Sequence, residues 1–375
     1  MKSFFVFIVA VLVLNTGCGA SDMPGLMNSP SGETHEIEVE VLVENLENPW
    51  SIAFLPDGSM LIAERPGRLR FFRDGQLSEP ISGLPPIWQN GQGGLLEVAL
   101  HPDYENNGWI YLAYASSDDG QKGNTAIGRG QLEGNSLLNF ETLFRGSPLT
   151  DLSYHFGCRI VFDELNRLYF PIGDRGEMTN AQKLDNHNGK LMRINDDGSI
   201  PQDNPFAEEA EAMPEIYNYG HRNIQGMAIH PLSGEIWTHE HGPRGGDEIN
   251  IEKAGANYGW PLVTYGINYD GTTISHDTTL PGITDPIHYW VPSIAPCGMC
   301  FVTSDTYPNW KNNLMVTALA GQQIQRLTLS GTQVVDTEIL LQGYARFRDI
   351  RQGPDGFLYV LTEDPGQLIR LKPLD

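Results

Sequence analysis

A repeated two-strand pattern constrains this sequence more than any other feature. Each copy has an apolar stretch, a turn rich in Pro, Asp, Gly or Asn, and a second apolar stretch. The clearest copies are IAFLPDGSMLIAE from Ile52 and IRQGPDGFLYVLTE from Ile350, and the others begin near Val98, Ile160, Met227 and Met299. Apolar runs about such turns are typical of β-hairpins, and helical periodicity of useful length is absent. The chain is therefore expected to be all-β.

The six copies begin about 45 to 75 residues apart, which suits the four-stranded blades of a β-propeller. We predict a single six-bladed β-propeller over residues 37–375. Residues 38–43, EVEVLV, alternate polar and apolar side chains and are expected to form the outer strand of the last blade. This pairing closes the ring and leaves no free edge. A β-sandwich whose hairpins are alike by chance is the alternative.

The N-terminal segment, residues 1–18, is expected to be a signal peptide. A positive start is followed by a short apolar run, and Cys18 follows small residues in the pattern of a lipoprotein cleavage box. This interpretation predicts an exported protein, periplasmic or held at the outer membrane by a lipid anchor. Ordinary cleavage near Ala20, giving a soluble secreted protein, is the alternative. Residues 19–36 are polar, with Pro and Gly, and are expected to be a flexible tether.

The formal net charge of −23 disfavours a phosphate backbone as partner, so no nucleic acid is expected. Beyond Cys18, the cysteines Cys158, Cys297 and Cys300 are too few for a disulfide framework. The last two form a CxxC pattern, but nothing near them resembles a thioredoxin-type βαβ unit. We interpret them as a local disulfide or as two buried thiols.

Residues 239–261, HEHGPRGGDEINIEKAGANYGWP, are dense in groups that do chemistry. Glycine and proline fix the backbone so that its carbonyl oxygens are available as ligands. Carbonyls beside carboxylates are the ligands that a hard cation such as calcium prefers. The stretch is therefore expected to hold a divalent cation. Its histidines are poorer candidates, because calcium prefers oxygen.

A histidine and a carboxylate are expected to meet in the third copy of the repeat. His155 lies in YHFGCR, which opens the copy, and Asp174 ends the second strand of the same hairpin. A carboxylate there holds the imidazole in one tautomer and raises its basicity, as a general base requires. A structural histidine is the alternative. Arg159 is interpreted as a structural cation that bonds carbonyls, and His187 is expected at the surface.

Further polar groups are expected at the same mouth of the ring, because loops between blades gather there. Gln92 lies in a glycine-rich loop that lets a flat ligand approach the backbone. Arg222 opens the fourth copy, and Arg346 and Arg348 open the last one and point to one side of a strand. Arginines suit the oxygens of a quinone or a polycarboxylate, and internal salt bridges are the alternative.

Two common enzyme classes fit this set of groups poorly. The sequence has neither the Ser or Cys elbow of a nucleophilic hydrolase nor the Gly-rich turn of a Rossmann fold. A flat anionic redox cofactor held by calcium and arginines fits better.

These segments together resemble the glucose/sorbosone dehydrogenase family. The likeness runs from NPWSIAFLPDG at Asn48 to YVLTEDPGQLIRLKP, and its most specific blocks are GQGGLLEVALHPDY, HFGCRIVFD, GHRNIQGMAIHP, HEHGPRGGDEIN, NYGWP and RFRDI. The resemblance implies an aldose sugar dehydrogenase that uses pyrroloquinoline quinone (PQQ) and calcium (Ca2+) on a six-bladed propeller. It implies oxidation of the anomeric carbon to a lactone, with electrons passed to a separate quinone or cytochrome.

The resemblance also implies roles for matching residues. His155 is similar to the family's general base and Asp174 to its orienting carboxylate. Arg222 and Asn223 resemble the pair that reaches the reactive carbonyl of PQQ. Other implied contacts to PQQ are Gln92, Arg346 and Arg348.

The same resemblance implies two calcium sites. The carbonyls of Gly242 and Pro243 resemble ligands of the calcium that contacts PQQ. Glu248 and the carbonyl of Tyr258 resemble ligands of a second, structural calcium, which is expected to face away from the channel.

Three positions depart from the glucose oxidisers of the family. Those enzymes have a lysine that contacts PQQ, and its position falls near Ala320 in this chain. The residue before the catalytic histidine is acidic in those enzymes and is Tyr154 here. The residue before their Gly-Pro ligands is a glutamine, and here it is His241. These departures place the chain nearer the broad-specificity aldose branch. A calcium-dependent lactonase or esterase, or a non-catalytic binding propeller, is the alternative function.

Overall fold

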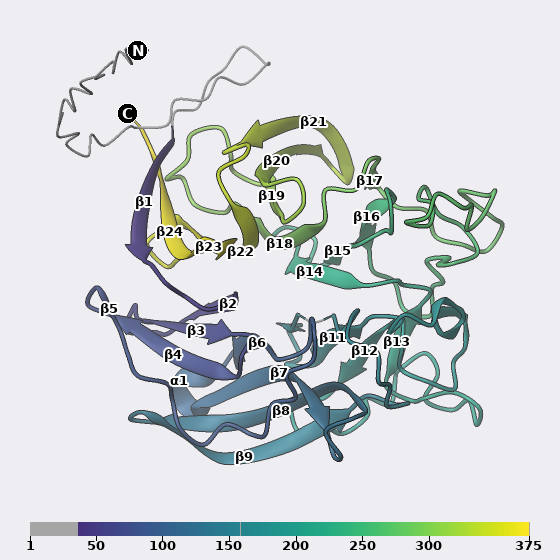
Figure 1. Ribbon diagram of the computed structural model, residues 1–375, viewed down its shortest axis with the longest axis horizontal. Helices are drawn as coiled ribbons and strands as arrows, with labels where there is room; N and C mark the ends of the chain where they lie inside the picture. Colours follow the sequence, from purple (N-terminus) through teal and green to yellow (C-terminus); the bar gives the residue numbers. More distant parts are fainter. Residues whose placement is uncertain (1–36, 158, 375) are drawn as a thin grey trace, which may run out of the picture.

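The computed structural model describes residues 37–374 except residue 158. The predicted signal peptide and tether, residues 1–18 and 19–36, lie outside the described residues. The described chain forms six four-stranded sheets arranged in a ring (Figure 1). Neighbouring strands in each sheet are antiparallel. The predicted six-bladed propeller is confirmed.

The first three blades follow the chain in order. Blade 1 contains β2 (Pro49–Phe54), β3 (Met60–Glu64), β4 (Arg68–Arg73) and β5 (Gln76–Leu77). Blade 2 contains β6 (Leu95–Leu100), β7 (Trp109–Ser117), β8 (Gly123–Glu133) and β9 (Ser136–Arg145). Blade 3 contains β10 (Val161–Phe162), β11 (Leu168–Ile172), β12 (Lys190–Ile194) and β13 (Ile216–Tyr219). Two short helices lie between strands, α1 (Tyr104–Asn107) and the 3-10 helix η1 (Met178–Gln182).

The remaining blades complete the ring. Blade 4 contains β14 (Ile224–Ile229), β15 (Ile236–Glu240), β16 (Asp247–Ile251) and β17 (His288–Trp290). Blade 5 contains β18 (Pro296–Phe301), β19 (Leu314–Ala318), β20 (Gln323–Ser330) and β21 (Gln333–Leu340). Blade 6 contains β22 (Arg346–Gln352), β23 (Leu358–Asp364), β24 (Gly366–Pro373) and β1 (Ile37–Val43). No helix in the described part of the chain is long and apolar enough to cross a membrane.

The ring closes through β1, which lies beside β24 (Figure 1). The two strands are antiparallel, with Ile37 opposite Pro373 and Val41 opposite Ile369. Apolar side chains of β1 pack against the core of blade 6. The strand predicted from the alternation in residues 38–43 therefore completes the last blade.

Each copy of the repeat supplies the first two strands of one blade. The second strands β3, β11, β15 and β19 are buried along their whole length. Both faces of such a strand are covered by the neighbouring blades, so each of its side chains is removed from water. This packing explains why both strands of each copy are apolar, and burial of that surface is the main stabilising contribution.

A buried ion cluster links the blades. Arg159 Nη1 lies 2.8 Å from Glu97 Oε2 and 3.2 Å from Asp349 Oδ1. Arg351 bonds the other oxygens of the same two carboxylates, at 2.7 Å and 3.2 Å. Arg159 also donates to the carbonyls of Gln225 and Arg348. It is therefore a structural cation, as interpreted from the sequence, and its partners come from three other blades, blades 2, 4 and 6.

Two further expectations concern cysteine and histidine. Cys297 and Cys300 are free, the first buried and the second half-buried, so the thiol interpretation holds rather than the disulfide. The surface position expected for His187 is wrong. Its side chain is buried, with Nδ1 accepting from the N–H of Ser147 at 3.0 Å and Nε2 3.3 Å from Glu215. The buried imidazole thus links the insert after β11 to the loop after β9.

Candidate active site

His155 and Asp174 meet at the start of blade 3. His155 lies in the loop before β10 with φ 58°, and Asp174 follows β11 by two residues. Nδ1 of His155 lies 2.6 Å from Oδ1 of Asp174. The carboxylate side chain is 1% exposed and the imidazole 13%. The hairpin thus brings together the pair that its sequence indicated, with part of the imidazole open to solvent.

The electrostatics of this pair favour a neutral imidazole. Burial lowers the pKa of His155, and the charge of Arg222 acts in the same direction, although the hydrogen bond with Asp174 opposes both. Burial raises the pKa of Asp174, but the hydrogen bond from His155 and the charge of Arg222 outweigh it, so the net shift is downward. With Asp174 ionised, the imidazole proton lies on Nδ1. Nε2 is then the acceptor atom that a general base requires.

Gln92 supports the base through the backbone. Its Oε1 accepts a hydrogen bond from the N–H of His155 at 2.9 Å. The backbone N–H of Gln92 donates to the carbonyl of Ser153 at 2.7 Å. The residue expected to contact a ligand is thus next to the base and contributes to its unusual backbone conformation.

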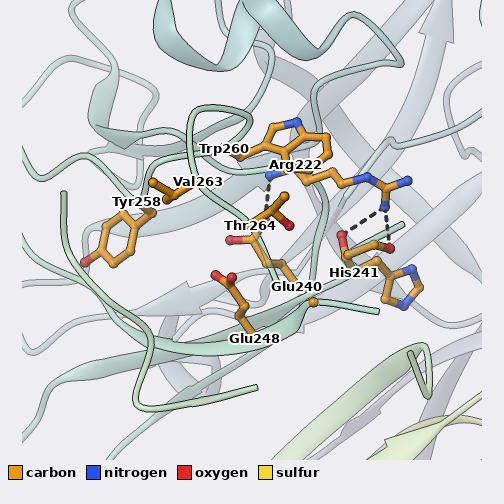
Figure 2. A pocket seen from close by; sticks show the side chains of 10 residues that line it. Arg222, Glu240, His241, Glu248, Tyr258, Trp260, Val263 and Thr264 are labelled. Carbon is orange, nitrogen blue, oxygen red and sulfur yellow. Dashed lines mark hydrogen bonds between the residues drawn. The ribbon is translucent and has the colours of Figure 1, made fainter. Parts of the chain in front are cut away.

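Arg222 follows β13 and faces the carbonyl oxygens of the next loop. Its Nη1 donates to the carbonyls of His241 and Gly242, both at 2.9 Å. The guanidinium carbon lies 5.4 Å from the centre of the Trp260 ring. Figure 2 shows both hydrogen bonds and the indole above them. The carbonyls therefore point toward the same space as the arginine.

Glu240 organises the backbone of the GHRN segment. Its Oε2 accepts from the N–H groups of Arg222 at 2.5 Å and Asn223 at 3.3 Å. Its Oε1 lies 2.8 Å from Nδ1 of His221. Burial lowers the pKa of His221, but Glu252 and Glu240 outweigh it and raise the pKa to about 10. The charged imidazolium and the carboxylate thus hold Arg222 and Asn223 in place.

The Gly242–Pro243 loop is held by Asp247. Oδ1 of Asp247 accepts from the N–H of Gly242 at 2.8 Å, and Oδ2 accepts from the N–H of Ile294 at 2.7 Å. A Cβ on Gly242 would lie 2.2 Å from the carbonyl oxygen of Gly245, so only glycine fits. Asp247 is thus an internal hydrogen-bond acceptor that fixes the backbone of this loop.

A small pocket, partly open to solvent, lies between this loop and the NYGWP segment. Its lining comprises Arg222, Glu240, His241, Gly242, Gly246, Glu248, Tyr258, Trp260, Val263 and Thr264. Figure 2 shows the carboxylate of Glu248 pointing into the space, between Tyr258 and Glu240. Residues of both predicted cation sites line one pocket, because Glu240 and Glu248 are opposite each other on β15 and β16.

The donor set of this pocket suits a hard cation. Burial and the neighbouring Glu240 raise the pKa of Glu248 well above its usual value. Two carboxyl groups so close together favour a positive charge between them. Backbone carbonyls supply the other oxygens, which calcium prefers. Within residues 37–374 other than 158, no three His, Cys, Asp or Glu side chains gather as metal ligands.

Arg346 and Arg348 share one carboxylate, as expected of two side chains on one side, although β22 has register shifts on both sides of Phe347. Arg346 Nη2 lies 3.3 Å from Glu363 Oε2, and Arg348 Nη2 lies 3.0 Å from Oε1. Arg65 Nη1 lies 3.9 Å from the same carboxylate. Arg348 stacks over Trp50 at 4.1 Å, and its Nε is buried with no hydrogen-bond partner. The internal salt bridges expected as the alternative are therefore present, but three arginines face a single carboxylate.

Three residues of the site were missed from the sequence. Glu363 forms ion pairs with the arginines, and Asp247 holds the glycine loop. Trp260 donates its indole N–H to Asp174 at 2.9 Å. Only the NYGWP block carried a signal, as a rigid aromatic segment. Tyr154, at one of the departures from the glucose oxidisers, is exposed and meets the ring of His155 edge to face at 4.9 Å.

Comparison with known proteins identifies the relatives of this chain. The model of a family described as Glucose / Sorbosone dehydrogenase matches residues 46–370. The aldose sugar dehydrogenase YliI of Escherichia coli (strain K12) is 45% identical over 345 residues, which cover 90% of this chain and 93% of that protein. The crystal structure of the soluble aldose sugar dehydrogenase from Escherichia coli in the apo form has a TM-score of 0.87 at 45% identity, over 90% of this chain and 100% of that chain. The PQQ-bound aldose sugar dehydrogenase from Streptomyces coelicolor has a TM-score of 0.75 at 27% identity, over 90% of this chain and 99% of that chain.

Proposed function

Because the chain belongs to the glucose/sorbosone dehydrogenase family, we propose that it is an aldose sugar dehydrogenase that uses PQQ and calcium to oxidise the anomeric carbon to a lactone. One observation carries the proposal. A half-buried histidine, oriented by an ionised aspartate at 2.6 Å, lies in the loop before β10. The PQQ-bound Streptomyces relative supports the choice of cofactor.

The His155–Asp174 pair supplies the proton chemistry. In the proposed reaction, Nε2 of His155 removes the proton of the anomeric hydroxyl. Asp174 keeps the other imidazole proton on Nδ1 and stabilises the imidazolium that forms. PQQ, when bound, supplies a quinone that accepts the hydride from the anomeric carbon. Arg222 places a fixed positive charge near the reacting groups, which favours the negative charge that develops there.

The residues present fit PQQ. PQQ is a flat polycarboxylate, and Glu363 is the one carboxylate within the described residues that forms ion pairs with the group of Arg65, Arg346 and Arg348. The unpartnered Nε of Arg348 is a further buried donor. Guanidinium groups recognise carboxylates through paired hydrogen bonds. We assign Arg346, Arg348, Gln92, Arg222 and Asn223 to the cofactor.

The residues present also fit calcium. The carbonyl oxygen of Gly242 accepts one hydrogen bond, from Arg222, and its second lone pair can bind a cation. We assign the carbonyls of Gly242 and Pro243 to a calcium at the cofactor. Glu248 and the carbonyl of Tyr258 are assigned to a second calcium in the pocket, where a cation offsets the repulsion between two carboxylates.

The proposal extends to the cellular context. The pattern around Cys18 supports export, with a lipid anchor at the outer membrane or release into the periplasm. Electrons then pass to a separate quinone or cytochrome. Labelling with a radioactive fatty acid, in the natural chain and in Cys18→Ser, tests the anchor. Label in both chains, or in neither, contradicts it.

Reconstitution tests the function. The purified protein is titrated with PQQ in calcium, and sugars are assayed with an artificial acceptor dye. We expect PQQ binding and oxidation of several aldoses. His155→Ala should lose about 10²- to 10⁴-fold in rate while it still binds PQQ. His276→Ala, at an exposed position, is the control. Full activity in His155→Ala would refute the base, and no PQQ binding, with turnover of lactones instead, would support the lactonase alternative.

A further inference from the structure

We propose that Trp260 is a positioning residue for the general base and acts through Asp174. Its indole Nε1 donates to Oδ2 of Asp174 at 2.9 Å, and the bond is buried. This inference rests on the proposed role of His155. It adds a residue, from blade 4, that fixes the carboxylate of a pair belonging to blade 3.

Three groups donate hydrogen bonds to the carboxylate of Asp174 in the described part of the chain. Oδ1 accepts from Nδ1 of His155 at 2.6 Å and from the N–H of Gly176 at 2.8 Å. Oδ2 accepts from the indole of Trp260. The carboxylate is fully buried, so the indole is the donor that replaces water at Oδ2. With both oxygens bonded, the carboxylate cannot rotate about its bond to Cβ without losing one of these contacts. Its Oδ1 therefore stays aimed at the imidazole.

Trp260 is itself held rigidly. Its backbone N–H donates to the carbonyl of Gly220 at 2.8 Å, and its carbonyl accepts from Nε2 of Gln182 at 2.8 Å. Gln182 and Asn257 exchange a reciprocal pair of amide hydrogen bonds, at 3.0 Å and 2.7 Å. The side chain of Trp260 is buried beneath Arg222. A donor fixed in this way can impose its geometry on Asp174 rather than follow it.

Loss of the indole N–H has a defined electrostatic consequence. The bond stabilises the charged form of Asp174, and without it the carboxylate becomes more basic. A more basic carboxylate holds the imidazolium of His155 more strongly, so the pKa of His155 rises. Hydrogen bonds to a charged group are among the stronger ones in proteins. We expect an upward shift of about one pH unit and a fall in kcat of about ten-fold, with little change in the KM for sugar.

The experiment replaces the indole in two ways. Trp260→Phe removes the N–H, and benzothienylalanine at position 260 replaces it with sulfur at nearly unchanged ring shape. The benzothienyl protein keeps the test valid if the Phe variant does not fold. Trp290→Phe is the matched control, because Trp290 is also buried and its Nε1 donates to Gln325 at 2.9 Å. The readouts are an NMR titration of 15N-labelled His155, assigned with His155→Ala, and the pH profile of kcat/KM.

Two results support the proposal and one overturns it. The first supporting result is a pKa of His155 that is higher in the benzothienyl protein but not in Trp290→Phe. The second is an acid limb of kcat/KM that moves to higher pH in the same protein. A His155 pKa and a kcat equal to those of the natural chain would overturn it. The NMR titration needs neither PQQ nor sugar. A protein that oxidises no sugar but shows the His155 shift therefore refutes the proposed function and leaves the positioning role intact.

Discussion

Nη1 of Arg222 lies 2.9 Å from the carbonyl oxygen of Gly242 and donates a hydrogen bond to it. The two residues are on opposite sides of one hairpin of blade 4, and Glu240 at the end of β15 holds the backbone of Arg222. A positive group thus faces the oxygen that we assign to calcium. The loop sets the direction of the Gly242 carbonyl, and only glycine fits at this position.

Gly242→Ala should weaken cofactor binding without unfolding the protein. The added methyl would lie 2.2 Å from the carbonyl oxygen of Gly245, so the loop must move and the Gly242 carbonyl turns from its present direction. We expect PQQ affinity in calcium to fall at least about ten-fold, a loss comparable to that of one hydrogen bond to a charged group. Fluorescence titration measures it. Gly271→Ala controls for backbone strain alone, because φ there is +89° but nothing lies within 4 Å of an added Cβ, and equal affinities of the two variants would contradict the prediction.

The pH dependence of the reaction should report the environment of His155. Its pKa is lowered by burial, so the neutral base persists below pH 6.5 and is lost as the pH falls through the lowered pKa. The acid limb of kcat/KM should therefore lie below pH 6.5.

Asp174→Asn should move that limb lower still, because the carboxylate raises the pKa of His155. The rate at pH 7 should also fall, by about 10²-fold, because the tautomer is no longer held. This direction is opposite to the one expected for loss of the Trp260 donor. An acid limb that moves upward in Asp174→Asn would refute our account of the pair.

Arg348→Leu should weaken binding of the anionic cofactor. The guanidinium is buried, stacked on Trp50 and bonded to Glu363, so packing fixes the position of its charge. Removing a hydrogen bond to a charged group costs roughly 1.5–3 kcal/mol, or about a ten- to hundred-fold loss of affinity. Calorimetric titration with PQQ measures this loss. Arg145→Leu, at an exposed pair with Asp118, should bind normally, and unchanged affinity in Arg348→Leu would exclude a direct contact.

Arg159→Leu should destabilise the fold. The change leaves the carboxylates of Glu97 and Asp349 buried with only Arg351 as a cationic partner. Breaking a buried ion pair in this way costs about 3–5 kcal/mol of unfolding free energy. Urea denaturation measures the loss, with Arg145→Leu as the exposed control at less than about 1 kcal/mol. Equal midpoints for the two variants would show that the cluster is not stabilising.

Deletion of residues 37–43 should open the ring. The deletion exposes the hydrogen-bonding edge of β24 and the apolar core of blade 6. An unpaired apolar edge promotes association between chains. A chain that begins at Glu44 should unfold at lower temperature and aggregate, whereas one that begins at Ile37 should not. Light scattering during thermal unfolding distinguishes the two, and identical curves would argue against closure through β1.

Local patterns account for the parts of the site that were predicted. His155 and Asp174 belong to one hairpin, so their proximity follows from the pairing of β10 with β11. Arg346 and Arg348 were expected on one side of a strand, and both reach Glu363 although β22 is irregular between them. The resemblance to a known family supplied the expected roles, which no local pattern carries. It also suggested two cation sites, and the structure adds that Gly242 and Glu248 line one pocket.

The sequence by itself determined the six-bladed ring and its closure by the first strand, because repeated hairpins and alternating side chains are local features. Only the tertiary structure decided which distant residues complete the site. Trp260 reaches Asp174 across 86 residues of chain, and Glu363 lies between arginines of blade 6 and Arg65 of blade 1. Such contacts depend on how neighbouring blades pack when the ring closes. Packing sets distances and donor directions between strands of different blades, and no spacing along the chain encodes them.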